Sequence, residues 1–373
     1  MPNLIVSPVG TSVLTQRPAD EAVLSLLRNT ANKQTADLSE QERSGLESHI
    51  EAIRARMANA DRDTWRRSSA EVNGILSYGQ PSRSDMHVLL GTDTWQGERA
   101  ADIVADFLRH ALNCPVDIVR PRRLSTRSRE DFSAGMIEFV KWCGDTLPGY
   151  QDGGYKIVFN LTGGFKSVQG YLNTLGMLYA DEIIYIFEPP SGELIVIPRL
   201  PVRLDEERLA REYSVAFELM SQACALSVES VCTSGIPESL LEFTEMDGAR
   251  CVGLNVWGVA VWSRLRKDAL RGTLLNWPLL QYTAEFEREY AHLGDSNAKA
   301  AVQEALAAAA AVLMRDGVNG LRGHGGLQYE DYNWHPGLAH FRVDGGRRIS
   351  CQTAENGLLL RHVGSHDYVN DNP

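Results

Sequence analysis

The stretch VFNLTGGFKS, residues Val158–Ser167, decides the fold that the sequence predicts. An apolar, strand-like run ends in a polar corner with two glycines, and a lysine opens a helix-prone segment. Glycines at such a corner let the backbone approach a ligand, and the free amides of a helix N-terminus attract anions. The corner Thr162–Lys166 is therefore a candidate anion site, with a tight turn and an exposed lysine as the alternative interpretation.

Residues 1–205, which surround this stretch, alternate between strand-like and helix-like segments. The alternation predicts an α/β domain with a mostly parallel sheet covered on both faces. The last two strands are expected to form a hairpin around Pro189–Gly192. Strands are expected at NLIVSP, DMHVLL, VDIVRP, YKIVFN, EIIYIFE and ELIVIP, and helices within residues 20–59 and at GERAADIVADFLRHAL, FSAGMIEFVKWCGDTL and FKSVQGYLNTLGMLYA.

Polar corners follow three of the expected strands. In a parallel sheet the carboxyl ends of the strands meet at one edge, where ligands of open α/β folds bind. These corners are therefore expected to converge on one site, although each alone is also typical of turns and helix caps. The candidate ligand-binding residues are Gly10, Thr11, Ser12, Thr92, Asp93, Asn160, Thr162, Gly163, Gly164 and Lys166.

Residues 206–320 favour helix almost throughout. Ile236–Glu245, with Pro237 in a first helical turn, is expected to be one of these helices. Two interpretations stay open, a winged helix-turn-helix unit and a helical linker. Mixed charges and the lack of a basic recognition helix favour a linker over residues 206–300.

Residues 301–373 form the expected C-terminal domain, a small α+β module. Short strands are joined by turn sequences, of which Glu355–Gly357 is a strong hairpin signal. Five of the nine histidines and five arginines lie after residue 320. Arginine binds phosphate in a bidentate fork and histidine moves protons near neutral pH, so this composition indicates chemistry on a phosphate.

The composition excludes several other classes of protein. A net charge of -11 over 373 residues argues against coating nucleic acid by bulk attraction. The six cysteines form no CxxC pair, and neither HExxH nor GxxxxGK followed by Ser or Thr occurs, so we expect no metal and no P-loop. Without a basic leader or a long apolar run, the chain is expected to be cytoplasmic and to contact no membrane.

Residues 1–205 resemble the CARF domain of CRISPR-associated effectors. The resemblance rests on SPVGTSVL, LLGTDTWQGERAADIV and NLTGGFKSVQGYL, in this order and in a Rossmann-like frame. CARF domains dimerise and bind cyclic oligoadenylate at the two-fold axis. The resemblance implies a homodimer whose pocket is lined by the corner residues, and cyclic tetra-adenylate is the favoured activator because a two-fold dimer suits a four-phosphate ring.

Residues 301–373 resemble the RelE-type ribosome-dependent mRNA interferases, with strand arginines and a terminal segment containing histidine and tyrosine. The resemblance implies metal-independent RNA cleavage, in which Arg342 and Arg348 stabilise the phosphorane charge. His340 or His366 would act as base or acid, and Tyr368 would stack on a base or assist proton transfer.

Together the two resemblances imply a type III CRISPR ancillary effector that needs no cofactor. Cyclic oligoadenylate would activate the nuclease, which would cut mRNA in the ribosomal A site. The expected partners are the ribosome with its mRNA, including a contact with a ribosomal protein. No DNA is expected as a partner. Two alternatives stay open. One is a CARF-controlled winged-helix transcription regulator, and the other is a ring nuclease that degrades cyclic oligoadenylate.

Overall fold

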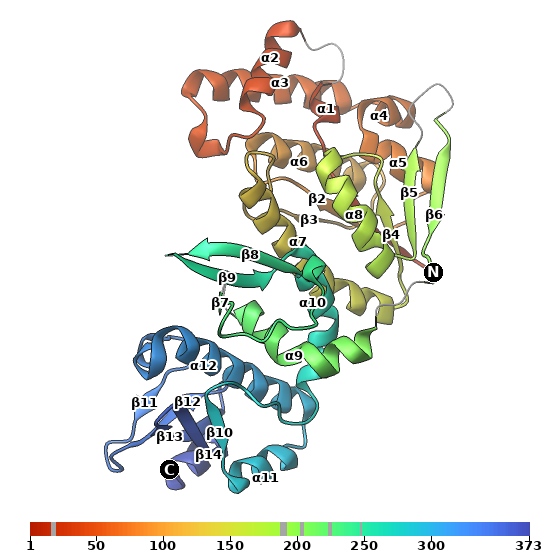
Figure 1. Ribbon diagram of the computed structural model, residues 1–373. Coiled ribbons are helices and arrows are strands. Elements are labelled where there is room, and N and C mark those ends of the chain that lie inside the picture. Colours follow the sequence, from red (N-terminus) through yellow and green to blue (C-terminus); the bar gives the residue numbers. More distant parts are fainter. Residues whose placement is uncertain (16–19, 187–191, 202–204, 223–225, 247) are drawn as a thin grey trace. The chain divides into compact units, whose positions relative to one another are not determined.

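The computed structural model describes residues 1–15, 20–186, 192–201, 205–222, 226–246 and 248–373. The chain divides into two compact units, Met1–Val202 and Arg203–Pro373 (Figure 1). Residues 189–191 of the expected hairpin turn lie outside the described residues.

The first unit is built on a six-stranded sheet in the order β3-β2-β1-β4-β5-β6. Five strands run parallel, and β6 pairs antiparallel with β5. The predicted α/β unit with a mostly parallel sheet and a final hairpin is thereby confirmed. The strands are β1 (Asn3–Pro8), β2 (Met86–Leu90), β3 (Val116–Val119), β4 (Lys156–Asn160), β5 (Glu182–Ile186) and β6 (Leu194–Pro198).

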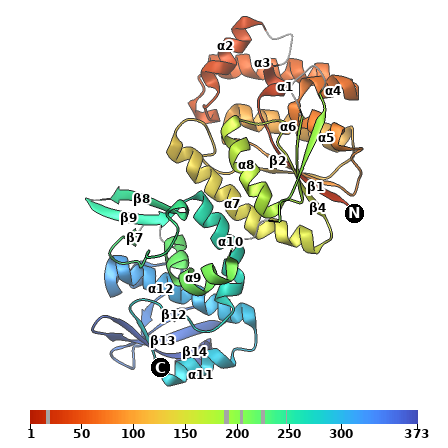
Figure 2. The same ribbon diagram turned by 45° about the vertical axis from the view of Figure 1, so that its right-hand side comes forward.

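Helices cover both faces of this sheet (Figure 2). Successive side chains of a strand point to opposite faces, so Ile5 and Val158 join the core beneath α3, α5 and α6, while the intervening apolar residues face α7 and α8. The helices are α1 (Ser12–Thr15), α2 (Glu21–Thr30), η1 (Thr35–Asp37), α3 (Glu40–Met57), α4 (Arg62–Ser68), α5 (Ala70–Tyr78), α6 (Trp95–His110), α7 (Arg129–Asp152) and α8 (Lys166–Tyr179).

The strand order reverses between β1 and β4. From β1 the chain proceeds to β2 and β3 on one side, and from β4 to β5 and β6 on the other. At such a reversal the two connecting segments leave in opposite directions and open a crevice at the carboxyl ends of the central strands. Residues 9–12 and 161–166 follow β1 and β4 at this point.

The second unit begins with helices α9 and α10 around a three-stranded antiparallel sheet of order β7-β9-β8. The prediction of a helix over Ile236–Glu245 is therefore wrong, because β8 pairs along its length with β9, and Gly248, at a φ of 78°, lies in the turn between them. The elements are α9 (Glu206–Gln222), β7 (Leu226–Ser227), η2 (Glu238–Leu240), β8 (Leu241–Met246), β9 (Ala249–Leu254) and α10 (Val256–Leu270).

The segment between β7 and β8, residues 228–240, is described throughout. It holds a single 3-10 turn, η2, and no α-helix. A helix-turn-helix reader places an α-helix in the major groove. The segment between these two strands therefore offers no such helix to DNA, and the linking role of the whole region stays a prediction.

The second unit ends in a five-stranded sheet of order β10-β14-β13-β12-β11. The expected strands after residue 330 are confirmed, but β10 comes from the region predicted as a linker and pairs parallel with β14. The elements are β10 (Leu280–Tyr282), α11 (Ala284–His292), α12 (Ser296–Gly323), β11 (Glu330–Asp331), β12 (Leu338–Arg342), β13 (Arg347–Ala354), β14 (Gly357–Ser365) and α13 (His366–Asp371). Within the described ranges, no helix is both long and apolar enough to cross a membrane.

Candidate functional site

The corners after β1 and β4 touch each other through their glycines. A Cβ placed on Gly10 would lie 3.1 Å from the backbone nitrogen of Gly164. Gly164 has a φ of 88°, and its Cβ would lie 2.7 Å from that of Pro8. Both positions need glycine for chain packing alone, so the glycines do not by themselves indicate a ligand.

A buried carboxylate, that of Glu71 on α5, joins the two corners. It is 0% exposed, and it accepts hydrogen bonds from Gly10 N at 2.7 Å, Ser69 Oγ at 2.7 Å and Ser12 Oγ at 3.2 Å. A Cβ on Gly163 would lie 2.2 Å from Glu71 Oε1, so this glycine makes room for the carboxylate. Sequence reasoning missed Glu71, because its partners in the corner, Gly10 and Ser12, lie about 60 residues away and its helical spacing shows only a polar position.

Asn160, at the end of β4, stabilises the corner through hydrogen bonds of its buried side chain. It is 0% exposed, its amide donates to Ser7 Oγ at 3.1 Å and to the Glu71 carbonyl at 2.9 Å, and its oxygen accepts from Thr162 N at 3.3 Å. The predicted direct contact of Asn160 with a ligand is untested, and its described bonds are those of a residue that positions the turn.

Several polar groups at the start of α8 have no hydrogen-bond partner among the described residues. The Oγ1 of Thr162 is buried and has no hydrogen-bond partner among the described residues. The helix begins after Phe165, which provides no side-chain cap, so the first-turn amides keep their donors. Lys166, in that first turn, is exposed. An anion at this corner would find backbone donors and a cation.

The corner after β2 is organised differently. Thr94 caps α6 and shares a 3.0 Å hydrogen bond with Thr92. Asp93 accepts hydrogen bonds from Gln34 Nε2 at 2.9 Å and from Arg123 N at 2.7 Å. The bonds of this corner thus go to its own helix cap and to neighbouring loops, whereas those of Gly10, Ser12 and Asn160 converge around Glu71.

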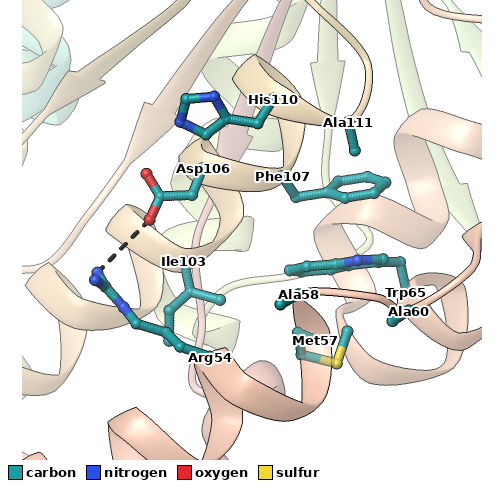
Figure 3. Close-up of a pocket in the computed structure, with 10 residues that line it drawn as sticks. All are labelled: Arg54, Met57, Ala58, Ala60, Trp65, Ile103, Asp106, Phe107, His110 and Ala111. Atoms are coloured by element: carbon teal, nitrogen blue, oxygen red, sulfur yellow. Dashed lines mark ion pairs between the residues drawn. The ribbon is translucent and has the colours of Figure 1, made fainter.

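A separate apolar pocket of about 270 Å³ lies among α3, α4 and α6. Figure 3 shows the rings of Trp65 and Phe107 stacked beside it, with centroids 4.3 Å apart. Arg54 and Asp106 form an ion pair of 3.6 Å at this pocket. None of the lining residues belongs to the β1 and β4 corners.

In the second unit, the predicted catalytic residues gather on one face of the C-terminal sheet. Strand register places His340 opposite Ser350, and Ser350 opposite His362, in one row across β12, β13 and β14. Arg342 lies opposite Arg348 in the next row of the same face. The opposite face is apolar and buried, so the polar side chains of these strands lie together on this face.

His340 lies at the centre of this polar face. It is 7% exposed, and Nη1 of Arg348 lies 3.2 Å from its Nδ1 and 3.3 Å from its Nε2. The ring of Tyr332 stands nearly perpendicular to the imidazole, with centroids 4.7 Å apart. Burial, followed by the charge of Arg348, lowers the pKa of His340, so its imidazole is neutral at neutral pH.

His362 faces the same side only because β14 carries a bulge. The register shifts between Ser350 and Cys351, and Arg361 has no opposite partner. Leu358 and Leu360 are buried before the bulge, and strict alternation would send His362 to their side. The bulge reverses the alternation and turns His362 to the polar face.

Glu289 of α11 holds this end of the polar face together. It accepts a hydrogen bond from His362 Nδ1 at 2.9 Å, from the Tyr368 hydroxyl at 2.5 Å and from Val363 N at 2.8 Å. The carboxylate raises the pKa of Tyr368 to about 12. The sequence prediction included Tyr368 but missed Glu289 and His362, because no sequence spacing connects α11 to β14.

The two remaining predicted residues lie at the edge of the polar face. Arg342 Nε donates to the carbonyl of Asp344 at 2.9 Å. His366 begins α13, is exposed, and contacts Asp367 Oδ1 through Nδ1 at 2.9 Å. Its charge contributes to the lowered pKa of His340, which places the two imidazoles in electrostatic range. In the part of the chain that the structure describes, no three His, Cys, Asp or Glu side chains are grouped to hold a metal ion.

One family model matches part of the chain. Residues 66–200 match the family model of a CRISPR-associated protein, Cas_APE2256. The matched segment includes Glu71 and the whole corner Asn160–Lys166. No curated protein matches the sequence at a significant level.

Among solved structures, the chain is similar to Enterococcus italicus Csm6 bound to cyclic hexa-2'-fluoro-hexa-dAMP. The identity is 16%, the TM-score is 0.32, and the match covers 60% of this chain. The chain spans 46% of the length of that protein.

Proposed function

We propose that this protein is an ancillary effector of type III CRISPR systems, in which cyclic oligoadenylate bound to the first unit activates an endoribonuclease in the second. The match of residues 66–200 to a CRISPR-associated family supports the class. The polar face around His340 and Arg348, where a neutral imidazole lies beside a guanidinium, is the observation that carries the nuclease.

The ligand site in this proposal is the pair of corners that follow β1 and β4. A phosphate of the ring would accept hydrogen bonds from the first-turn amides of α8 and from the Thr162 hydroxyl, and it would pair with Lys166. Two copies of the chain would present two such corners to one ring. Cyclic tetra-adenylate, with its four phosphates, matches that two-fold symmetry.

The nuclease chemistry in this proposal requires no metal. A base removes the 2′-hydroxyl proton, the 2′-oxygen attacks the adjacent phosphorus, and an acid protonates the 5′-oxygen as it leaves. Arg348 and Arg342 would stabilise the charge of the pentacoordinate phosphate. Neutral His340 has the protonation state of a base, His366 is a second candidate for proton transfer, and Tyr368 would stack on a nucleobase.

The proposed substrate is mRNA in the ribosomal A site. The chain carries a net charge of -11, so bulk attraction would not hold free RNA on the polar face. A ribosome that presents the mRNA removes this need. The ribosome would supply positioning, through a ribosomal protein among other contacts, and the protein would supply the catalytic groups.

The test is in vitro translation with and without cyclic tetra-adenylate, followed by primer extension on the mRNA. Activator-dependent cuts within A-site codons are expected for the wild type, and none for Arg348→Ala. Persistent cutting by Arg348→Ala, or no activator-dependent cuts at all, would overturn the nuclease proposal. If the wild type consumes the cyclic oligoadenylate and Arg348→Ala consumes it at the same rate, the first unit degrades the activator as a ring nuclease does.

A further inference from the structure

We infer that His362, held by Glu289, is the general acid that completes the proposed nuclease, with His340 as its general base. This inference rests on the proposed ribonuclease function and assigns the proton transfers within it. It adds two residues, His362 and Glu289, that the sequence did not single out.

The row His340–Ser350–His362 carries the geometric argument. Each residue lies opposite the next in strand register, so the two histidines occupy one face, separated by two strand spacings, or about 10 Å. Ser350 between them is 0% exposed, and its Oγ has no hydrogen-bond partner among the described residues. The space between the two imidazoles therefore holds a buried polar group whose hydrogen-bonding capacity is unused among the described residues.

The environments of the two histidines differ in the way that an acid and a base require. His340 has a guanidinium as its closest charged neighbour, which favours the neutral, proton-accepting form. His362 has the carboxylate of Glu289, to which its Nδ1–H donates. That bond orients the imidazole and leaves Nε2, on the far side of the ring from the carboxylate, as the nitrogen that faces a substrate.

The architecture around Glu289 is built to hold this arrangement. Its second oxygen accepts from Val363 N, at the point where β10 has ended and the edge of β14 would otherwise be unpaired. The β14 bulge turns His362 to the polar face. A helix contact and a strand irregularity thus act on one side chain, whereas a solvated surface histidine would need neither.

The proton transfers balance without a metal or a redox partner. The 2′-O–H bond breaks and His340 takes the proton, while a bond forms between the 2′-oxygen and phosphorus. The bond between phosphorus and the 5′-oxygen breaks, and His362 gives its Nε2 proton to that oxygen. The products are a 2′,3′-cyclic phosphate and a 5′-hydroxyl, and solvent restores the protonation states of both histidines.

The test uses the full-length protein with cyclic tetra-adenylate and ribosomes programmed with a short synthetic mRNA. One mRNA is unmodified, and the other carries sulfur in place of the 5′-bridging oxygen at the cleavage site. A thiolate leaves without protonation, so the second mRNA does not need a general acid. The variants are His362→Ala, His362→Gln, Glu289→Gln and His340→Ala, with His292→Ala, an exposed residue on α11, as the matched control.

On unmodified mRNA we expect His362→Ala to lose about 10²–10⁴-fold in rate, the usual contribution of a general acid. On the sulfur mRNA its rate should come within about tenfold of the wild type, because the acid is no longer needed. Glu289→Gln, which removes only the positioning charge, should show the same recovery from a smaller defect. His340→Ala should stay defective on both mRNAs, and His292→Ala should match the wild type.

Recovery on the sulfur mRNA also proves that a variant is folded. The acid assignment is overturned if His362→Ala and His362→Gln cut unmodified mRNA at the wild-type rate, or if both lose equally on the two mRNAs. The proposed function fails in a different way, when the activated wild type cuts neither mRNA.

Discussion

Replacing Glu71 with alanine tests how the candidate ligand corner is held together. The carboxylate accepts three hydrogen bonds from the corner and from the cap of α5, and its side chain is fully buried. The bonds from Gly10 N and Ser69 Oγ, both 2.7 Å, go to a charged acceptor and are each worth about 1.5–3 kcal/mol. The longer bond from Ser12 Oγ adds less. Glu71→Ala should therefore reduce the free energy of unfolding by about 3–6 kcal/mol.

Thermal unfolding followed by circular dichroism measures this loss. For a unit of this size, each kcal/mol lowers Tm by about 2–4 °C, so Glu71→Ala should melt roughly 10 °C below the wild type. Glu71→Gln keeps one acceptor oxygen for Gly10 N and should lose only about 1–2 kcal/mol. Glu51→Ala, an exposed residue of α3, is the control and should stay within about 0.5 kcal/mol of the wild type. If Glu71→Ala melts like Glu51→Ala, the carboxylate does not hold the corner.

Two other predictions concern the first unit. His87 on β2 is fully buried, and burial lowers its pKa from 6.5 to about 4. The unfolded chain then binds the proton more tightly than the folded chain, so stability falls as pH drops from 7 to 4. In urea unfolding, this loss of stability should be about 3 kcal/mol larger for the wild type than for His87→Leu. Equal losses in the two proteins would contradict the burial argument. Gly164→Ala, at positive φ and 2.7 Å from Pro8, should cost about 2–4 kcal/mol in the same assay, and a neutral effect would show that the two corners do not touch.

The fold of the first unit could be predicted because its signals are local. Each strand is a short apolar run, each helix has its own periodicity, and the alternation of the two leaves little choice but a parallel sheet. The order of the strands around β1 and β4 places the predicted corners Gly10–Ser12 and Thr162–Lys166 together. What local signals could not show was the reason for the glycines, which is the close contact of the two corners and of Gly163 with Glu71.

The hairpin β8–β9 shows where local preference fails. Leu241–Met246 contains leucine and glutamate, which favour helix in isolation. In the structure the whole segment pairs with β9, so its backbone hydrogen bonds are made between strands and not within a helix. Tertiary context thus overrides the intrinsic preference. The partner strand β9 has Arg250 as its one charged residue. The charges of the two segments therefore did not show that they pair.

The residues of the polar face stood out in the composition of the sequence, but their arrangement did not. Arg342, Arg348 and His340 follow directly from alternation along two short strands, because residues two apart share a face. His362 does not, since the bulge at Arg361 changes the face of every later residue in β14. A one-residue irregularity in pairing is set by the whole sheet and leaves no periodic trace in the sequence.

In the proposed function, a ligand at the β1 and β4 corner controls RNA cleavage in the other unit. The most direct measurement is the rate of A-site mRNA cleavage as a function of cyclic tetra-adenylate concentration, for the wild type and for Lys166→Ala. Loss of one charged contact to phosphate, about 1.5–3 kcal/mol, should move the half-activating concentration upward about 10–100-fold and leave the maximal rate unchanged. A cleavage rate that does not depend on the activator, or an unshifted curve for Lys166→Ala, would contradict the claim.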